Sequence, residues 1–336
     1  MASYTDDEVV AADFIERSIL NCRSETPSMA VPGACPGRAV VIPDVHRGRR
    51  ATSGSPEDGV GHVPAREEEE VVVVNSSNLK GKRAAVFGAG GSIGAAIARE
   101  FAAQGAEVFL SGRTKSKVEA LAKEIDPTGT RVHAAQVDAN DEAAVAAYVD
   151  DVVREAGGVD VAFNAIGPRP QEYGGGMNAL DITVNQYMHP LMTVVRSQFI
   201  TAIAAARHMK KQGSGVILFI TGSPARPHTE GATAIGAAFA SLENLTRHLA
   251  IELSPAGIRP VCLRSSAMPD TRTIQDVTRN IALAMSVSEV EASQFLAGST
   301  MLHLSPTTAD TAKVAAFLAS DSARTITGTQ VMSEIR

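Results

Sequence analysis

Residues 83–104 read RAAVF, then GAGGSIG, then AAIAREFAAQ, and this stretch decides the fold. A short apolar run that leads into a glycine-rich turn and then into an amphipathic pattern predicts a strand, a tight turn and a helix. Such a turn presents bare backbone N–H groups and the positive end of a helix, which together suit a dinucleotide pyrophosphate. The stretch therefore predicts a site for a nicotinamide cofactor.

Composition excludes several other classes of function. The chain has 336 residues, of which 44% are hydrophobic, and its net charge of -6 gives no reason to expect nucleic acid or an anionic membrane as a partner. No apolar run approaches the roughly 20 residues of a membrane helix, and acidic residues 6–8 stand where a signal sequence would be basic. Cys22, Cys35 and Cys262 lack metal-ligand spacing. We expect a cytoplasmic protein that acts on a small molecule and binds no metal.

Residues 1–78 differ from the rest of the chain. Prolines are spread there among Gly, Ser and Arg, and an acidic run follows at residues 67–70. Because this composition buries little apolar surface, we expect an N-terminal extension that is largely disordered, with one short helix at residues 6–20. We interpret the valine run at residues 71–74 as a linker to a dinucleotide-binding domain that covers residues 79–336.

From residue 79 onward, short apolar runs alternate with longer helical patterns. This alternation predicts an α/β fold, a Rossmann-like doubly wound parallel sheet of about seven strands with helices on both faces. The expected strands cover residues 83–87, 107–111, 131–137, 159–164, 215–221, 258–263 and 330–333. The expected helices cover residues 93–104, 116–125, 141–156, 191–212, 232–253 and 307–319. Residues 271–301 are expected to form a less regular helical segment in the place of a substrate lid.

The motifs along this domain resemble those of the short-chain dehydrogenase/reductase family, from Leu79 to about Met332. The turn of that family reads Thr-Gly-x-x-x-Gly-Ile-Gly. Phe87–Gly94 stands in its place, with the family's glycines at the second and last positions and with Phe and Ser replacing the Thr and the middle Gly. The resemblance implies that the cofactor phosphates lie against Gly88, Gly90, Ser92, Ile93 and Gly94.

The end of the second strand bears on the choice of cofactor. It reads Ser111-Gly112-Arg113-Thr114, where an NAD enzyme would place an acidic residue against the ribose hydroxyls. A guanidinium suits a 2′-phosphate instead, because it can form two parallel hydrogen bonds with it. We therefore expect NADP rather than NAD. The alternative is that Arg113 is a solvated charge of a loop.

Other cofactor contacts follow from the resemblance. Asp138 and Ala139 stand at the end of the third strand, where the family's Asp accepts from the adenine amino group; alternatively, Asp138 caps the helix that begins near residue 141. Asn164 and Ala165 match part of the family's Asn-Asn-Ala-Gly, which borders the ribose. Thr271 stands where the family often places a Thr against the nicotinamide carboxamide.

The catalytic positions of the family are altered. In the family a Tyr exchanges the proton, a Lys four residues later lowers the pKa of that Tyr, a Ser polarises the carbonyl and an Asn stands on an earlier helix. Alignment on residues 245–253 places Ile235, Phe239, Gly222 and Val194 at these four positions. No Tyr occurs after residue 187 and the one Lys after residue 211 is residue 313, so no shifted pair exists. These replacements argue against an ordinary alcohol dehydrogenase.

Other side chains are candidates to replace the missing catalytic residues. Thr221 and Ser223 lie at the end of the fifth expected strand, and His228 follows on the same loop with an imidazole suited to proton exchange near neutrality. The alternative for His228 is an exposed loop residue. Tyr187 and His189 lie beyond a Gly-Gly-Gly segment and could close over a ligand, although Tyr187 could equally pack against the domain.

Two classes of function remain open from the sequence. The first is an NADPH-dependent oxidoreductase that reduces a small organic carbonyl, enone or imine with a non-standard proton donor. The second is a catalytically degenerate NADP-binding module that acts through a partner; a non-redox catalyst on the same scaffold is a further alternative. Small residues at positions 234–240 would let helices approach closely, and the resemblance implies a homodimer or homotetramer through this helix.

Overall fold

The computed structural model describes residues 78–225, 230–298, 300 and 302–333. The expected N-terminal extension, its short helix, the valine linker and His228 lie outside the described residues. All the described residues belong to one compact unit.

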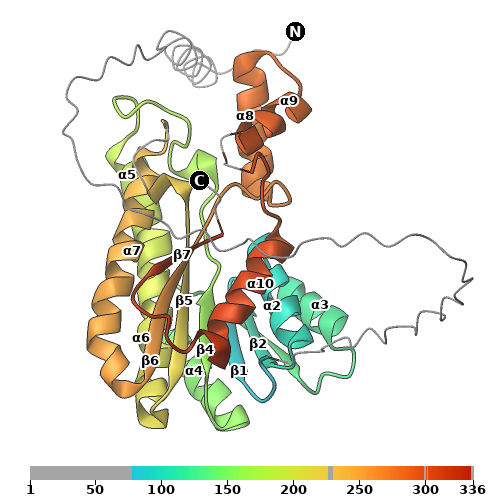
Figure 1. Cartoon of the computed structure of the whole chain (residues 1–336), viewed down its shortest axis with the longest axis vertical. Coiled ribbons are helices and arrows are strands. Elements are labelled where there is room, and N and C mark those ends of the chain that lie inside the picture. Colours follow the sequence, from blue (N-terminus) through green and yellow to red (C-terminus); the bar gives the residue numbers. More distant parts are fainter. Residues whose placement is uncertain (1–77, 226–229, 299, 301, 334–336) are drawn as a thin grey trace, which may run out of the picture. The chain divides into compact units, whose positions relative to one another are not determined.

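Seven parallel strands form one sheet, in the order β3-β2-β1-β4-β5-β6-β7 (Figure 1). The strands are β1 (Arg83–Phe87), β2 (Glu107–Gly112), β3 (Val132–Gln136), β4 (Val161–Asn164), β5 (Gly215–Gly222), β6 (Ile258–Ser265) and β7 (Gln330–Ser333). Each expected strand is present within three residues of its expected ends, because continuous apolar runs mark strands that are buried on both faces. The prediction of a doubly wound α/β fold is confirmed.

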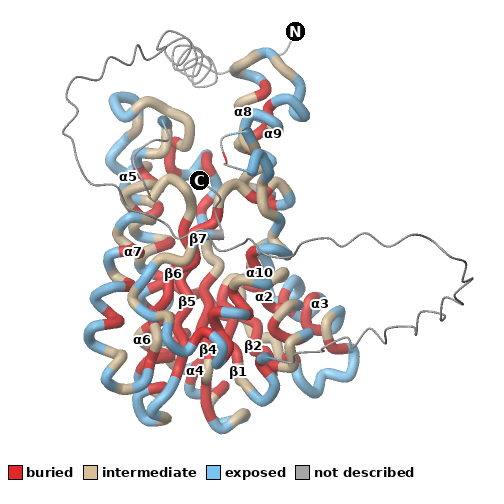
Figure 2. Tube along the Cα trace, viewed as in Figure 1, coloured by how far each residue is buried: buried red, intermediate tan, exposed pale blue. Residues whose placement is uncertain are grey.

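Helices cover both faces of this sheet. On one face lie α2 (Ser92–Ala103), α3 (Lys115–Ile125) and α10 (Thr308–Ala319), and on the other lie α4 (Glu142–Ala156), α6 (Arg196–Gln212) and α7 (Thr233–Leu253). Two apolar clusters, one on each face, fill the space between sheet and helices, and Figure 2 shows the strands buried along their length. Ring contact between Phe87 and Tyr148, with centroids 5.5 Å apart, joins β1 to α4.

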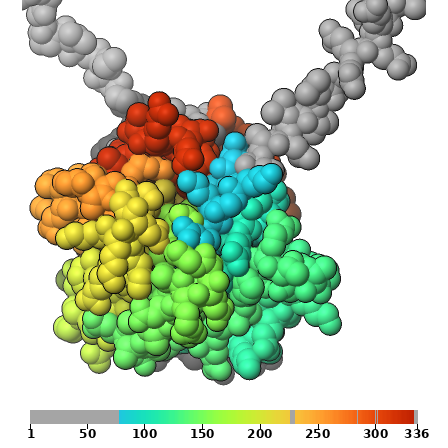
Figure 3. Space-filling model, turned by 90° about the horizontal axis from the view of Figure 1, so that it is seen from below, coloured from blue at the N-terminus to red at the C-terminus, as the bar shows by residue number. Residues whose placement is uncertain are grey.

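Segments from both ends of the described chain meet at the amino ends of the strands. The Nζ of Lys82, just before β1, lies 2.9 Å from the carboxylate of Asp321, which follows α10. Figure 3 shows the blue and red segments side by side on this face. The segments that follow β4 and β6 lie at the opposite end, where Figure 1 shows α5 (Val184–Pro190), α8 (Arg272–Met285) and α9 (Glu289–Gly298).

The helix expected at residues 191–212 is longer and interrupted. It begins as α5 after a capping box between Thr183 and Gln186, passes through a π-helical segment, η2 (Leu191–Val195), and continues as α6. Pro190 lacks a backbone N–H and cannot donate within the helix, so the hydrogen-bond pattern changes there. The capping box Thr-x-x-Gln was the sequence signal for the earlier start.

A membrane-spanning helix and a cluster of metal ligands are both absent from the part of the chain that the structure describes. No helix there is long and apolar enough to cross a membrane. No group of three or more His, Cys, Asp or Glu side chains there is placed to hold a metal ion.

Candidate functional site

The glycine-rich turn joins β1 to α2 and leaves no room for a side chain at two positions. Gly88 has a φ of +72°, and a Cβ there would lie 2.9 Å from Cγ1 of Ile166. A Cβ on Gly94 would lie 2.5 Å from the carbonyl oxygen of Gly88. The N–H of Ala89 donates to the carbonyl of Ser111 at 3.0 Å, which fastens the turn to β2. The turn therefore exposes backbone in the way that a phosphate cradle requires.

Helix α2 begins without a side-chain cap. Gly91 is its N-cap residue, no side chain bonds to its first turn, and that turn contains no acidic residue. Helix geometry leaves the N–H groups of Ser92 and Ile93 without acceptors inside the helix. These donors and the helix dipole favour an anion at this end, by about 0.3–1 kcal/mol for an exposed charge.

A cleft of about 300 Å³ opens beside this turn. It lies between the segments that follow β1, β2, β3 and β4, and the strand order reverses between β1 and β4. Doubly wound sheets bind their ligands at this reversal. The cleft is lined by Gly88, Gly90, Gly91, Gly112, Arg113, Thr114, Lys117, Val118, Val137, Asp138, Ala139, Asn140, Ala165, Ile166, Gly167, Pro168, Glu172, His189 and Thr193.

One corner of the cleft is basic. It contains Arg113, Thr114 and Lys117, from the loop after β2 and the first turn of α3. Thr114 is the N-cap residue of α3, yet its side chain makes no cap bond, and the first turn of α3 has no acidic residue. The ion pairs of α3 join Lys115 to Glu119 and Glu124 to Arg99 of α2, and within the described ranges no carboxylate pairs with Arg113 or Lys117. This corner therefore presents two cations and a hydroxyl to the cleft.

The opposite wall is polar and comes from the segment after β3. Asp138 does not cap α4, because Asp141 does so by accepting from the N–H of Ala144 at 3.0 Å. The Asp138 carboxylate instead accepts from the N–H of Asn140 at 2.9 Å through one oxygen. The side-chain oxygen of Asn140 is buried without a hydrogen-bond partner in the described structure. The Asp138 carboxylate thus offers this wall an acceptor that a ligand could satisfy.

Asn164 is held inside the protein rather than at the cleft. It is 3% exposed; its amide nitrogen donates to Thr201 at 3.1 Å and to Ser197 at 3.4 Å, and its oxygen accepts from the N–H of Ile166 at 2.9 Å. These bonds tie the end of β4 to α6 and fix the path of the next residues, Ala165 onward, along the cleft. Its assignment as a cofactor ligand stays a prediction.

At the end of β5 the space is apolar. Ile235 and Ala234 of α7 pack with Tyr173 from the segment after β4, and Phe239 lies against this cluster. A Cβ on Gly222 would lie 3.2 Å from the ring of Phe239. Burial raises the pKa of Tyr173 to about 12. None of the three α7 residues in this cluster carries a group that can exchange a proton.

The candidate catalytic side chains have different surroundings. Thr221 is buried, and its hydroxyl lies 3.4 Å from a carboxylate oxygen of Glu243 and 3.4 Å from the sulfur of Cys262, so it faces α7 and β6. Ser223 is half-buried in the 3-10 turn that follows β5. His228 lies outside the described residues.

Thr271 and Val194 are both buried, and their contacts are with other residues of the protein interior. The Thr271 hydroxyl caps α8 by accepting from the N–H of Ile274 at 3.3 Å and donates to the carbonyl of Met268 at 2.8 Å. Val194 lies in the π-helical segment, buried in the apolar cluster on the α6 face. The role of Thr271 against a carboxamide stays a prediction.

The family model described as Enoyl-(Acyl carrier protein) reductase matches residues 88–334. The chain belongs to the short-chain dehydrogenase/reductase (SDR) family. Its sequence is 32% identical to the 7alpha-hydroxysteroid dehydrogenase of Escherichia coli (strain K12) over 187 residues, which are 55% of this chain and 71% of that protein. It is 27% identical to the uncharacterized oxidoreductase UxuB of Bacillus subtilis (strain 168) over 192 residues, 54% of this chain and 69% of that protein.

Solved SDR-type structures share the fold. The 7 alpha-hydroxysteroid dehydrogenase complexed with NADH and 7-oxo glycochenodeoxycholic acid superposes with a TM-score of 0.67 at 26% identity, over 78% of this chain and 97% of that chain. A NAD+-bound xylitol dehydrogenase superposes with a TM-score of 0.69 at 24% identity, over 76% of this chain and 98% of that chain. With the family match, these relatives identify the chain as an SDR-type oxidoreductase.

The structure brings part of the predicted cofactor set together at this cleft. Six of the predicted cofactor residues line it (Gly88, Gly90, Arg113, Asp138, Ala139 and Ala165), and Ser92, Ile93 and Gly94 form the first turn of α2 beside the glycine loop. Among the polar lining residues that the sequence analysis did not name as cofactor ligands are Thr114, Lys117 and Glu172; it named His189 as a residue that could close over a ligand. For Lys117 the helical spacing from Thr114 was a usable signal, whereas the sequence has no local signal that Glu172 reaches the cleft.

Proposed function

We propose that this SDR enzyme is an NADP-dependent oxidoreductase that reduces a small organic carbonyl, enone or imine. The observation that carries the proposal is the cleft at the β1/β4 reversal, with the uncapped start of α2 on one side and the basic corner on another. Titration of the purified chain with NADPH and NADH tests cofactor binding. A panel of aldehydes, ketones, enones and imines, followed by NADPH absorbance, tests turnover.

The residues present fit a nicotinamide dinucleotide. The bare backbone at Gly88 and Gly94 suits the pyrophosphate, and the carboxylate of Asp138, which lines the cleft, suits the adenine amino group. The loop from Ala165 onward borders the position expected for the nicotinamide ribose. Such a cofactor supplies a hydride when bound, and the protein residues orient it and exclude water.

The preference for NADP rests on the basic corner. Arg113 can bind a 2′-phosphate with two parallel hydrogen bonds, Lys117 adds a second charge, and the free Thr114 hydroxyl adds a donor. We expect Arg113→Ala to weaken NADPH binding by about tenfold or more, since a hydrogen bond to a charged group contributes about 1.5–3 kcal/mol. NADH binding should stay within about threefold. Equal losses for NADPH and NADH in fluorescence titrations would contradict this assignment.

The alternative function is an NADP-binding module that acts through a partner. It is favoured by the apolar cluster of Ile235 and Phe239, which puts no proton-exchanging group on α7 at the end of β5. The two functions differ in turnover: the module binds NADPH but consumes none with any member of the substrate panel. In an enzyme, by contrast, at least one substrate oxidises NADPH at a rate that depends on cleft residues.

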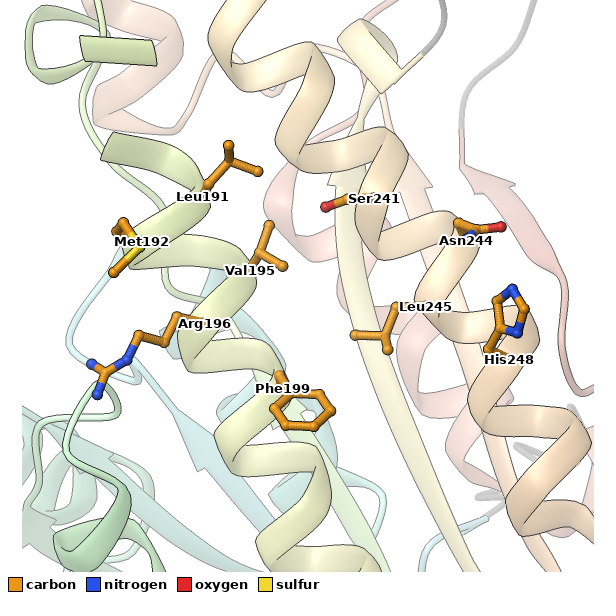
Figure 4. A pocket seen from close by; sticks show the side chains of 9 residues that line it. All are labelled: Leu191, Met192, Val195, Arg196, Phe199, Ser241, Asn244, Leu245 and His248. Atoms are coloured by element: carbon orange, nitrogen blue, oxygen red, sulfur yellow. The ribbon is translucent and has the colours of Figure 1, made fainter. Parts of the chain in front are cut away.

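We also propose that the chain forms a homodimer or homotetramer through α6 and α7. A groove of about 580 Å³ lies between them, lined by Leu191, Met192, Val195, Arg196, Phe199, Ser241, Asn244, Leu245 and His248 (Figure 4). Met192 is 55% exposed and Phe199 is 48% exposed, which is a large apolar exposure for a helix surface. A monomer mass in light scattering would contradict this assembly. The cytoplasmic location stays a prediction from the sequence.

A further inference from the structure

Two titratable side chains face each other in the wall of the cleft near the loop after β4. The Nε2 of His189 lies 3.8 Å from Oε2 of Glu172, and both residues line the cleft. Their side chains are 33% and 48% exposed, so each is packed on one side and reachable on the other. Both residues lie in the lining that also contains Ile166, Gly167 and Pro168.

The Glu172 carboxylate is held in place by its own turn. Its Oε2 accepts from the backbone N–H of Arg169 at 2.6 Å, and the N–H of Glu172 donates back to the Arg169 carbonyl at 3.0 Å. The Arg169 guanidinium in turn lies 2.6 Å from the Asp276 carboxylate of α8. The turn that carries Glu172 is therefore fixed both to itself and to α8.

His189 is placed by a helix of irregular geometry. It is the second-last residue of α5, directly before Pro190 and the π-helical segment. Its carbonyl accepts from the hydroxyl of Thr193 at 2.7 Å, and Thr193 also lines the cleft. The wider turns of a π-helix re-aim side chains and recur at functional sites. This irregularity directs an imidazole to the cleft wall beside Glu172.

We propose that His189 is the proton donor of the reduction and that Glu172, whose carboxylate oxygen lies 3.8 Å from its Nε2, is its acidic partner. The proposal rests on the proposed function. Among the residues that the structure describes, five titratable ones line the cleft: Arg113, Lys117, Asp138, Glu172 and His189. Arg113 and Lys117 belong to the basic corner, and Asp138 accepts from its own turn. Imidazole is the one side chain among them that both donates and regains a proton near neutral pH.

For a carbonyl substrate, a nicotinamide cofactor held in this cleft would supply a hydride to the carbonyl carbon and would be oxidised by two electrons, while the carbonyl π electron pair would move to oxygen. The N–H bond of the His189 imidazolium breaks, and its proton passes to that oxygen to form the alcohol. His189 then regains a proton from water.

The charged groups beside this pair lie on the turn after β4 and on α8. Glu172 lies on that turn, Arg169 on the same turn pairs with Asp276, and Arg279 of α8 lies 3.4 Å from the other oxygen of Asp276. Within the described ranges, Glu172 is the carboxylate that pairs with the imidazole of His189. Its removal should therefore leave the ring without its nearest counter-charge.

The test uses the full chain with NADPH. With 13C-labelled histidine, the His189 ring signal, assigned by its loss in His189→Gln, is expected to shift as NADPH saturates the protein. His208, which lies 2.8 Å from Asp150 on the outer helices, is a matched His–carboxylate pair remote from the cleft, and its signal should stay in place. For any substrate that the wild type turns over, His189→Gln should lower kcat by about a hundredfold or more. Glu172→Gln should give a smaller loss, and His208→Gln none.

The outcomes separate this proposal from the proposed function. An unchanged His189 signal on NADPH binding, or full activity of His189→Gln, overturns the donor role alone. Loss of activity in Tyr173→Phe with full activity in His189→Gln would assign the proton to the buried phenol instead. A wild type that binds NADPH but reduces no substrate of the panel overturns the proposed function, and the donor role falls with it. Misfolding of His189→Gln is excluded by an NADPH Kd within about threefold of the wild type.

Discussion

A methyl group added to Gly94 should damage cofactor binding although it adds a good helix former. The new Cβ would lie 2.5 Å from the Gly88 oxygen and 2.8 Å from the Cα of Ala89, both backbone atoms that cannot rotate away. The turn must therefore move by about 0.5 Å before this contact becomes tolerable, and overpacking of this kind costs about 1–3 kcal/mol. Alanine recovers about 1 kcal/mol through its helix propensity. The net loss in the free energy of unfolding should be about 0–2 kcal/mol, so Gly94→Ala should fold.

The same movement should weaken cofactor binding more than it lowers the free energy of unfolding. It displaces the amide donors at the start of α2, and a hydrogen bond to a charged group contributes about 1.5–3 kcal/mol. The Kd for NADPH should rise about 10- to 100-fold in fluorescence titrations. Gly298→Ala is the matched control, because a Cβ on that helical glycine meets nothing within 4 Å. Wild-type NADPH affinity in a folded Gly94→Ala variant would refute the phosphate cradle at this turn.

Three other perturbations probe the fold and the assembly. Burial acts to raise the pKa of Asp160, but hydrogen bonds from Arg83 on β1 hold this pKa below the usual range. The ionised carboxylate therefore stabilises the fold above about pH 4, and this contribution is lost as the pH falls. Asp160→Asn should reduce the pH dependence of the free energy of unfolding in that window. Glu243→Gln should lower the free energy of unfolding in urea by about 3–5 kcal/mol, because it leaves the charge of Arg264, which is 1% exposed, without its carboxylate partner. The control Glu124→Gln, in an exposed ion pair, should lower it by less than about 1 kcal/mol. Phe199→Asp should yield a monomer in light scattering if the groove of α6 and α7 joins subunits, and an unchanged oligomer would locate the interface elsewhere.

The cofactor half of the protein could be predicted from sequence because its determinants are local. A strand, a turn with glycines at fixed positions and a helix start lie within Arg83–Ala103, and their geometry follows from the order of residues alone. Arg113 and Asp138 follow the next two strands directly, so their place at the same edge of the sheet follows from parallel pairing. For these residues the sequence carries nearly all the information.

The substrate half could not be predicted in the same way, because its side chains come from distant segments. Tyr173 meets Ile235 across 62 residues of chain, a contact that depends on how the loop after β4 folds back on α7. The position of His189 depends on the π-helical segment, which a regular 3.6-residue periodicity does not register. Thr221 was predicted from its place at a strand end, but side-chain direction in a strand alternates, and this hydroxyl turns toward Glu243.

Three of the four positions that the alignment predicts to be altered lie together in the structure. Phe239 lies beside Gly222, where a larger residue would have to displace the ring, and Ile235 packs on Tyr173, which is buried. A tyrosine restored at residue 235 would therefore compete with Tyr173 for the same apolar space. Glu172 precedes Tyr173 in the chain. A change in the packing of the Tyr173 ring would therefore also shift the turn that holds Glu172 beside His189. A proton donor on the β4 side of the cleft and an apolar α7 are thus consistent parts of the same arrangement.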